Sequence, residues 1–157
     1  MIEVFISHKQ EDYATALSVY NAFLKNNINA YLDLLDNSIT GDGKELTEHI
    51  KKRLNECTDI IVVMSEETKK SWWVPFEIGM SAQVDMPTAS FLKSNVALPS
   101  YLSYWPRLKT TSDIDTYVTV RQKTEQIIHK QYGYRRSDAI RSVETSKFYE
   151  ALKKELR

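Results

Sequence analysis

The chain has 157 residues, a length typical of one domain with its own hydrophobic core. Its 21 basic and 21 acidic residues cancel, so we expect no nucleic acid as a partner. The single cysteine, Cys57, excludes an internal disulfide and cysteine-based metal clusters; the three histidines lack ligand spacing, so no metal is expected.

No apolar run is long enough to cross a bilayer. The first residues also lack the basic start and apolar stretch of a signal peptide. We therefore expect a cytoplasmic protein with no membrane partner.

Four segments rich in β-branched and apolar residues are interpreted as strands: 2–7, 28–33, 58–65 and 88–93. The third is continuously apolar, as in a central parallel strand covered on both faces. Between the strands lie two apolar stripes with helical spacing, Tyr13, Ala16, Leu17, Tyr20, Phe23 and Leu24, and then Leu46, Ile50, Leu54 and Cys57. This alternation predicts βαβ units and a parallel sheet.

The second half of the chain has a weaker pattern. The aromatic-rich stretch 101–105 holds a short edge strand or none. Ser112 is a candidate N-cap of a helix that Gly133 ends. The side chains expected on the buried side of that helix are Ile114, Tyr117, Val118, Ile127 and Ile128.

A last helix is predicted from a stripe of apolar residues spaced by four, namely Phe148, Leu152 and Leu156. This tail lies outside the βα pattern. It packs either on the domain or on a second subunit, and the sequence does not separate the two.

In an open parallel sheet, ligands bind beyond the carboxyl ends of the strands. This rule selects the segment 7–9 after the first strand, the loop 34–43 after the second, and the segment 65–73 after the third. Trp73 and Glu77 then lie at or just inside the next helix, where a spacing of four puts both side chains on one face.

A flat apolar ring beside a carboxylate can hold a nitrogen heterocycle and stabilise positive charge on an attached sugar. The Trp73–Glu77 pair therefore indicates a site for glycosidic-bond chemistry. Each residue also has an ordinary structural interpretation: Trp73 as a packing residue, Glu77 as a surface acid favoured near a helix start, and Lys9 as a solvated lysine.

Other chemistries fit less well. The glycine motifs that cradle phosphates are absent from the sequence. A catalytic triad of Ser7, His8 and Asp12 fails because adjacent residues of an extended segment point in opposite directions. A receiver domain would need an acidic cluster at the end of the first strand, which reads Ile6-Ser7-His8.

Two motifs together resemble a known family. Val4-Phe5-Ile6-Ser7-His8-Lys9-Gln10-Glu11-Asp12 resembles the first signature of Toll/interleukin-1 receptor (TIR) domains, and Ser71-x-Trp73-x-x-x-Glu77 resembles the segment that carries the catalytic glutamate of NAD-cleaving members. Residues 33–43 occupy the place of the TIR "BB" loop, although they lack its typical Pro-Gly pair, and 98–106 is similar to small bacterial stand-alone members.

The resemblance covers residues 1–131, which we take as a TIR domain, with 132–157 as a C-terminal helical extension. It implies an α/β, flavodoxin-like fold: a five-stranded, mostly parallel sheet with helices on both faces. It implies Glu77 as the catalytic residue. Substrate-binding residues that it implies are Trp73 on the nicotinamide side and Phe5, Ser7, His8, Lys9, Asp33 and Ser38 around the remaining cleft.

The implied function is that of an NAD nucleosidase or ADP-ribosyl cyclase of bacterial anti-phage defence, similar to the TIR component of Thoeris systems. Such an enzyme makes a signalling nucleotide from NAD, which is a substrate, so no separate cofactor is implied. TIR–TIR self-association and a product-sensing effector are the implied protein partners.

Two alternatives stay open. One is a non-catalytic TIR scaffold that acts by TIR–TIR contacts. The other is a nucleoside deoxyribosyltransferase-like enzyme, which shares the fold class and also uses a glutamate.

Overall fold

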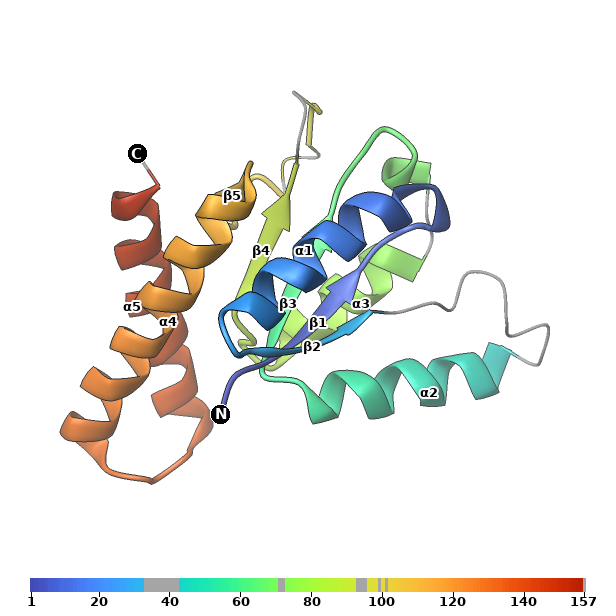
Figure 1. The fold of residues 1–157 in the computed structure, drawn as a ribbon. Helices are drawn as coiled ribbons and strands as arrows, with labels where there is room; N and C mark the ends of the chain where they lie inside the picture. Colours follow the sequence, from blue (N-terminus) through green and yellow to red (C-terminus); the bar gives the residue numbers. More distant parts are fainter. Residues whose placement is uncertain (33–42, 71–72, 93–95, 99, 101, 157) are drawn as a thin grey trace.

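A parallel sheet of five strands in the order β2-β1-β3-β4-β5 organises the described part of the chain (Figure 1). The computed structural model describes residues 1–32, 43–70, 73–92, 96–98, 100 and 102–156; the side chains of Lys69 and Trp73 are outside the described part. The strands are β1 (Glu3–Ser7), β2 (Asn29–Leu32), β3 (Asp59–Val63), β4 (Thr88–Phe91) and β5 (Arg107–Leu108). All four pairings are parallel, which confirms the predicted fold class.

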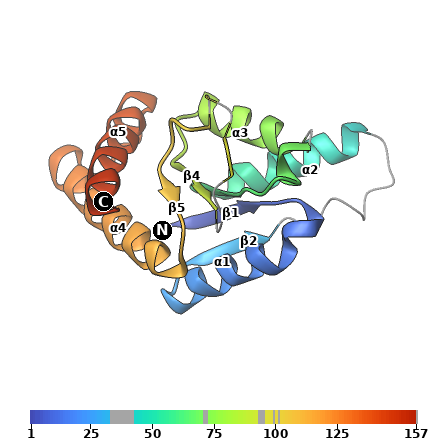
Figure 2. The ribbon, with the colours of Figure 1, turned by 90° about the horizontal axis from the view of Figure 1, so that it is seen from above.

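The helices are α1 (Tyr13–Lys25), α2 (Gly43–Glu56), α3 (Trp73–Gln83), α4 (Thr111–Tyr132) and α5 (Asp138–Glu155), with short 3₁₀ turns η1 (Gln10–Asp12) and η2 (Thr68–Lys70). Figure 2 shows α1 and α4 on one side of the sheet and α2 and α3 on the other, with α5 alongside α4. No described helix combines the length and the apolar character needed to span a bilayer.

The strand β3 lies in the centre of the sheet, between β1 and β4, and all five of its residues are buried. Its continuous apolar run follows from this position, because helices cover it on both faces. The stretch 101–105 was expected to hold a short edge strand or none. The edge strand β5 begins after it, and residues 102–105 form turns.

Helix α1 forms where its apolar stripe predicts a helix, but its buried side is rotated. Tyr13, Leu17 and Leu24 are 40%, 36% and 44% exposed, whereas Val19 and Phe23 are fully buried. The spacing thus predicted the helix, and only part of its apolar stripe is buried.

Helix α4 begins earlier than its predicted cap. Thr110 is the N-cap: its side chain accepts a hydrogen bond from the Asp113 backbone N–H, and the Asp113 side chain accepts one from Thr110, forming a capping box. Ser112 therefore lies inside the helix. Gly133 ends the helix as expected, with a φ of 67° that suits glycine. Ile127 was wrongly predicted to be buried and is 55% exposed.

Helix α5 packs on the domain, which decides between the two placements left open by the sequence. Its buried residues Phe148, Tyr149 and Leu152 belong to the same core cluster as β1, α1 and α4, and the Tyr149 hydroxyl accepts a hydrogen bond from the Thr88 backbone N–H at 2.8 Å. The helical extension is thus part of the core. The boundary at residues 131 and 132 stays a prediction.

A buried ionic network joins β3 to both C-terminal helices. The fully buried Asp59 carboxylate accepts hydrogen bonds from the Tyr117 hydroxyl at 2.7 Å and from Arg121 Nε at 3.0 Å. Arg121 also donates from Nη1 to Glu144 at 2.5 Å. Burial, together with the charge of Asp59, raises the pKa of Tyr117 well above its usual value, so its hydroxyl stays a donor.

We expect Asp59→Asn to lower the free energy of unfolding by about 3 kcal/mol, because it leaves the buried guanidinium of Arg121 with one carboxylate partner instead of two. Chemical denaturation measures this loss. The exposed control Glu150→Gln on α5 is expected to change stability by less than about 0.5 kcal/mol. Equal stability of Asp59→Asn and the wild type would contradict a stabilising role for the network.

Candidate functional site

Ser7 and Glu77 meet at the carboxyl edge of the sheet. Ser7 is the last residue of β1 and is fully buried, and Glu77 lies in the second turn of α3 and is 3% exposed. The Ser7 hydroxyl donates a hydrogen bond to Glu77 Oε2. Burying a carboxylate costs free energy unless hydrogen-bond donors compensate for the lost water. The Ser7 hydroxyl therefore offsets part of the cost of burying Glu77.

The strand register explains why two residues so far apart in sequence meet. Ser7 is paired with Val62, near the end of β3, and the chain returns from β3 through η2 into α3. The first turns of α3 therefore lie over the ends of β1 and β3. This is the edge at which open parallel sheets bind ligands.

The two residues after Ser7 take different positions. His8 is 9% exposed, its Nδ1 lies 3.3 Å from the Ile6 carbonyl oxygen, and its ring centroid is 6.1 Å from that of Tyr13. Lys9 is partly exposed, and its Nζ lies 3.6 Å from Glu11 Oε1. Lys9 thus keeps a cationic group at the same edge as Glu77.

Asp12 ties the loops after β1 and β3 together. Its Oδ2 accepts hydrogen bonds from the hydroxyls of Ser65 at 2.7 Å and Thr68 at 2.5 Å. Thr68 Oγ1 also accepts from the Ser65 backbone N–H, and Ser65 Oγ accepts from the Thr68 backbone N–H. Asp12 ends the first signature, but no sequence pattern predicts its contacts with Ser65 and Thr68.

Of the remaining predicted site residues, only Phe5 has a described side chain. Phe5 is fully buried in the core between the sheet and the helices α2 and α3, with its ring centroid 5.7 Å from that of Tyr31. Asp33 and Ser38 lie outside the described residues, as does the loop that contains them. Trp73 begins α3 four residues before Glu77, but its side chain is outside the described part, so its assigned role stays a prediction.

The buried Glu77 carboxylate can stabilise a positive charge that develops next to it. A carboxylate held by a hydroxyl away from water does so more strongly than the same group in water. Within the described residues, no group of three histidine, cysteine or acidic side chains lies close enough together to hold a metal ion. A cavity of about 520 Å³ lies elsewhere, and none of the predicted site residues lines it.

Comparison with known proteins adds independent findings. A family model described as "TIR domain" matches residues 4–127. The Cytobacillus dafuensis protein "Putative cyclic ADP-D-ribose synthase TIR2" is 29% identical over 86 residues, which cover 52% of this chain and 23% of that protein. The chain therefore spans less than a quarter of the length of that relative.

Two solved structures share the fold. The TIR domain of the Toll-related receptor TRR-2 from Hydra magnipapillata is 16% identical, with a TM-score of 0.55, over 66% of this chain and 82% of that chain. The 2-deoxyribosyltransferase from Bacillus psychrosaccharolyticus is 10% identical, with a TM-score of 0.58, over 71% of this chain and 89% of that chain. At such low identities the likeness shows the fold alone.

The Asp12 contacts lead to a prediction about the loop that precedes α3. We expect Asp12→Ala to speed backbone hydrogen exchange in residues 65–70 roughly tenfold or more, because two side-chain hydrogen bonds worth about 1 kcal/mol each are lost. The neighbouring exposed Glu11→Ala serves as the control and leaves exchange there unchanged. Equal exchange in both variants would show that Asp12 does not hold this loop.

Proposed function

Because the chain belongs to the TIR domain family, we propose that it cleaves NAD at the nicotinamide–ribose bond. The observation that carries the proposal is the buried Glu77 carboxylate, held by the Ser7 hydroxyl at the carboxyl edge of the sheet. The name of the Cytobacillus dafuensis relative, "Putative cyclic ADP-D-ribose synthase TIR2", supports the same reaction class.

The chemistry follows from the charges. Nicotinamide is cationic in NAD and leaves neutral, so positive charge passes to the ribose as the bond breaks. Glu77 accepts hydrogen bonds from the ribose hydroxyls and stabilises this oxocarbenium-like state, each charge-assisted bond being worth roughly 1.5–3 kcal/mol. Ser7 keeps the carboxylate in place. Trp73, one helical turn earlier, borders the nicotinamide in this proposal.

The nucleophile determines the product. Attack by water gives ADP-ribose, nicotinamide and a proton. Attack by an adenine nitrogen or a ribose hydroxyl of the same molecule consumes no water and gives a cyclic ADP-ribose, nicotinamide and a proton. The name of the relative favours the cyclic product, and we extend the proposal to a signalling nucleotide made in bacterial anti-phage defence of the Thoeris type.

The proposed partners follow from the reaction. NAD is the substrate, with no separate cofactor. A product-sensing effector receives the nucleotide, and TIR–TIR contacts bring copies of the chain together in the cytoplasm. The BB-loop positions that the family uses for such contacts lie outside the described residues.

Two rival functions use the same fold. A scaffold without turnover has no use for a buried carboxylate at the ligand edge, so the Ser7–Glu77 contact favours an enzyme. The structural likeness to a 2-deoxyribosyltransferase keeps a nucleoside-directed enzyme as the second candidate, because that fold also accommodates glycosidic-bond chemistry. NAD and 2′-deoxynucleosides tested side by side distinguish the two enzymes.

The first functional prediction concerns Glu77. We expect Glu77→Gln to slow nicotinamide release from NAD by about a hundredfold or more, because the amide keeps the shape but not the charge that stabilises the transition state. Nicotinamide is measured over a range of protein concentrations, since self-association is proposed. The exposed variant Glu150→Gln keeps the wild-type rate. Equal rates for the wild type and Glu77→Gln would remove Glu77 from the catalytic role.

The second functional prediction concerns Ser7 as a positioning residue. Ser7→Ala is expected to lower kcat about tenfold and to leave KM nearly unchanged, because the hydroxyl acts through the carboxylate and not on the substrate. The control is Ser81→Ala, which removes another buried hydroxyl from α3 that bonds only the Ile78 carbonyl and neighbouring Thr88. A matching loss of kcat in Ser81→Ala would indicate a general packing effect instead.

A further inference from the structure

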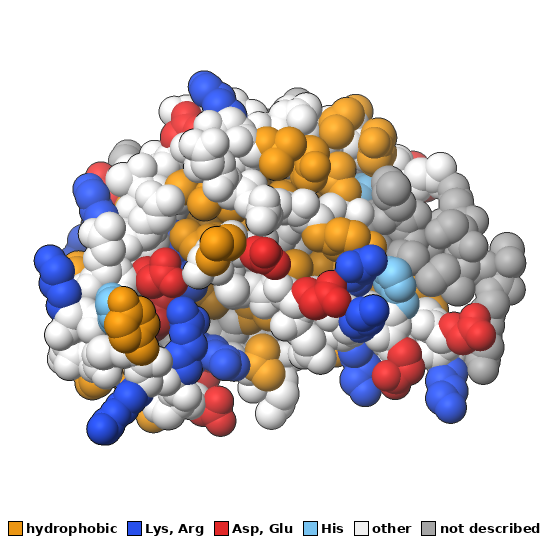
Figure 3. Space-filling model, turned by 60° about the horizontal axis from the view of Figure 1, so that its bottom comes forward, with side chains coloured by type: hydrophobic (Ala, Val, Ile, Leu, Met, Phe, Trp, Pro, Cys, Tyr) orange, Lys and Arg blue, Asp and Glu red, His pale blue; other side chains and the backbone are white. Residues whose placement is uncertain are grey.

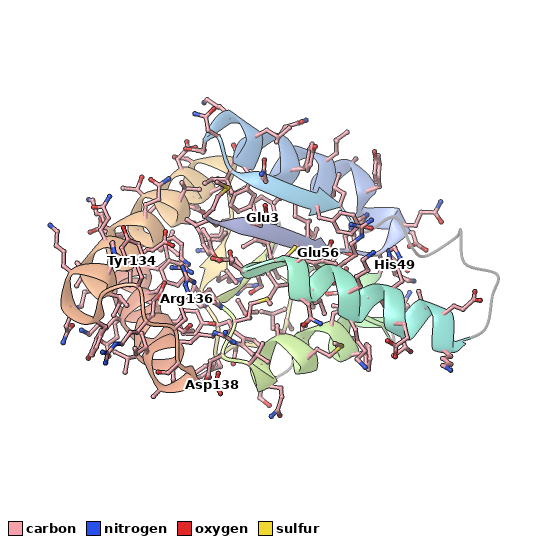
Figure 4. All side chains as sticks on the ribbon, turned by 90° about the horizontal axis from the view of Figure 1, so that it is seen from below. Glu3, His49, Glu56, Tyr134, Arg136 and Asp138 are labelled. Atoms are coloured by element: carbon pink, nitrogen blue, oxygen red, sulfur yellow. The ribbon has the colours of Figure 1, made fainter. Side chains whose placement is uncertain are left out.

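A second concave site lies at the amino edge of the sheet, opposite the edge that carries Glu77. It is a cavity of about 520 Å³, within the usual size range of small-molecule sites. Its walls come from the end of α2, the residues before β3 and β4, the helices α4 and α5, and the loop 133–137 that joins them. Figure 4 shows Tyr134 and Arg136 on this loop, beside the amino ends of the strands.

The floor of the cavity holds a fixed guanidinium. Arg121 is 5% exposed and lines the cavity, and the carboxylates of Asp59 and Glu144 hold its Nε and Nη1. Its Nη2 makes no hydrogen bond with the described residues. Because the guanidinium is planar and rigid, the two ion pairs also fix the direction of the Nη2 donors.

Positive side chains outnumber negative ones among the residues that line the cavity. Four arginines line it, Arg121, Arg135, Arg136 and Arg141, against the two glutamates Glu125 and Glu144. The acids Glu3, Glu56 and Asp59 act on Cys57 at the opposite wall, so the positive charge is concentrated on the side of α5 and the loop 133–137. Figure 3 shows this face of the molecule, on which Lys and Arg side chains are interspersed with Asp and Glu side chains.

Two of these arginines have no carboxylate partner among the described residues. Arg135 is exposed on the loop, and Arg141 Nη1 donates only to the Val84 carbonyl oxygen, at 3.3 Å. Arg136, by contrast, pairs with Glu125 at 3.6 Å. On the opposite wall, burial raises the pKa of Cys57 to about 12, so its thiol stays protonated and adds no negative charge.

An aromatic surface lies next to these charges. Tyr134 is 89% exposed, and its ring centroid is 3.8 Å from that of His129, which also lines the cavity. His129 supports one part of the tyrosine ring, and the outer part stays open to solvent. A planar base can stack there while phosphates reach the arginines.

We propose that this cavity is a second ligand site, which binds a small phosphorylated ligand of the nucleotide class. Arg135 and Arg141 contact the phosphates, Arg121 donates its remaining N–H groups to them from the floor, and Tyr134 stacks on the base. The site is separate from the Glu77 edge, and binding there does not require that the chain cleave NAD.

The test is calorimetric titration of the purified chain with ADP, pyrophosphate and adenosine. The Glu77→Gln variant is the background, so that turnover does not interfere. We expect ADP to bind most tightly, pyrophosphate less tightly and adenosine least. Arg135→Glu/Arg141→Glu is expected to weaken ADP binding at least tenfold, and Tyr134→Ala to weaken ADP but not pyrophosphate.

The matched control reverses two exposed charges outside the cavity, Lys25→Glu/Lys52→Glu, and is expected to bind ADP like the background. Four results would overturn the proposal: no ADP binding at millimolar concentration, adenosine binding as tight as that of ADP, equal ADP affinity in the arginine and lysine double variants, or ADP binding unaffected by Tyr134→Ala. Both double variants change exposed residues, so a folding defect does not account for a difference between them.

Discussion

The contact between the Ser7 hydroxyl and the Glu77 carboxylate depends on the geometry of the parallel sheet. Parallel strands put all their carboxyl ends at one edge, and the chain must cross back over the sheet before each next strand. The register of β1 against β3 therefore sets the end of β1 beside the first turns of α3. Burial then makes the carboxylate useful, because a charge held away from water acts strongly on a cation that forms next to it. The sheet thus determines where this one acid lies.

The opposite edge of the same sheet is organised by a second buried acid. Asp59 begins β3 and binds Tyr117 and Arg121 of α4, and Arg121 extends the network to Glu144 of α5. This network ties the C-terminal helices to the sheet and builds the floor of the cavity between them. One strand thus links two polar sites: its carboxyl end borders the Glu77 edge, and its amino end borders the arginine-lined cavity. The C-terminal helices and the loop that joins them, which the βα pattern does not explain, contribute most of the residues that line that cavity.

Sequence periodicity predicted the sheet, its parallel pairing and the helical segments well, because β-branched runs and helical spacing report burial directly. Strand order and a family motif selected Glu77 and Ser7, which the structure has in contact at the carboxyl edge of the sheet; their roles stay predictions. Periodicity failed where burial depends on the shape of a neighbour: Leu24 and Ile127 have the spacing of core residues and face solvent. It missed the bonds from Asp12 to Ser65 and Thr68, since no spacing rule joins residues of different loops. Phe5, which the resemblance assigns to the cleft, has its side chain in the core, and its assigned role stays a prediction.

The central claim is that the Glu77 edge acts on the glycosidic bond of NAD. Mass spectrometry of the products formed when NAD is incubated with the purified chain tests this claim most directly, because it decides activity and product class together. The account predicts free nicotinamide with an equal amount of ADP-ribose or of a cyclic ADP-ribose, which is lighter than ADP-ribose by one water. NAD left intact at every protein concentration, with base exchange on 2′-deoxynucleosides by the same preparation, would contradict it.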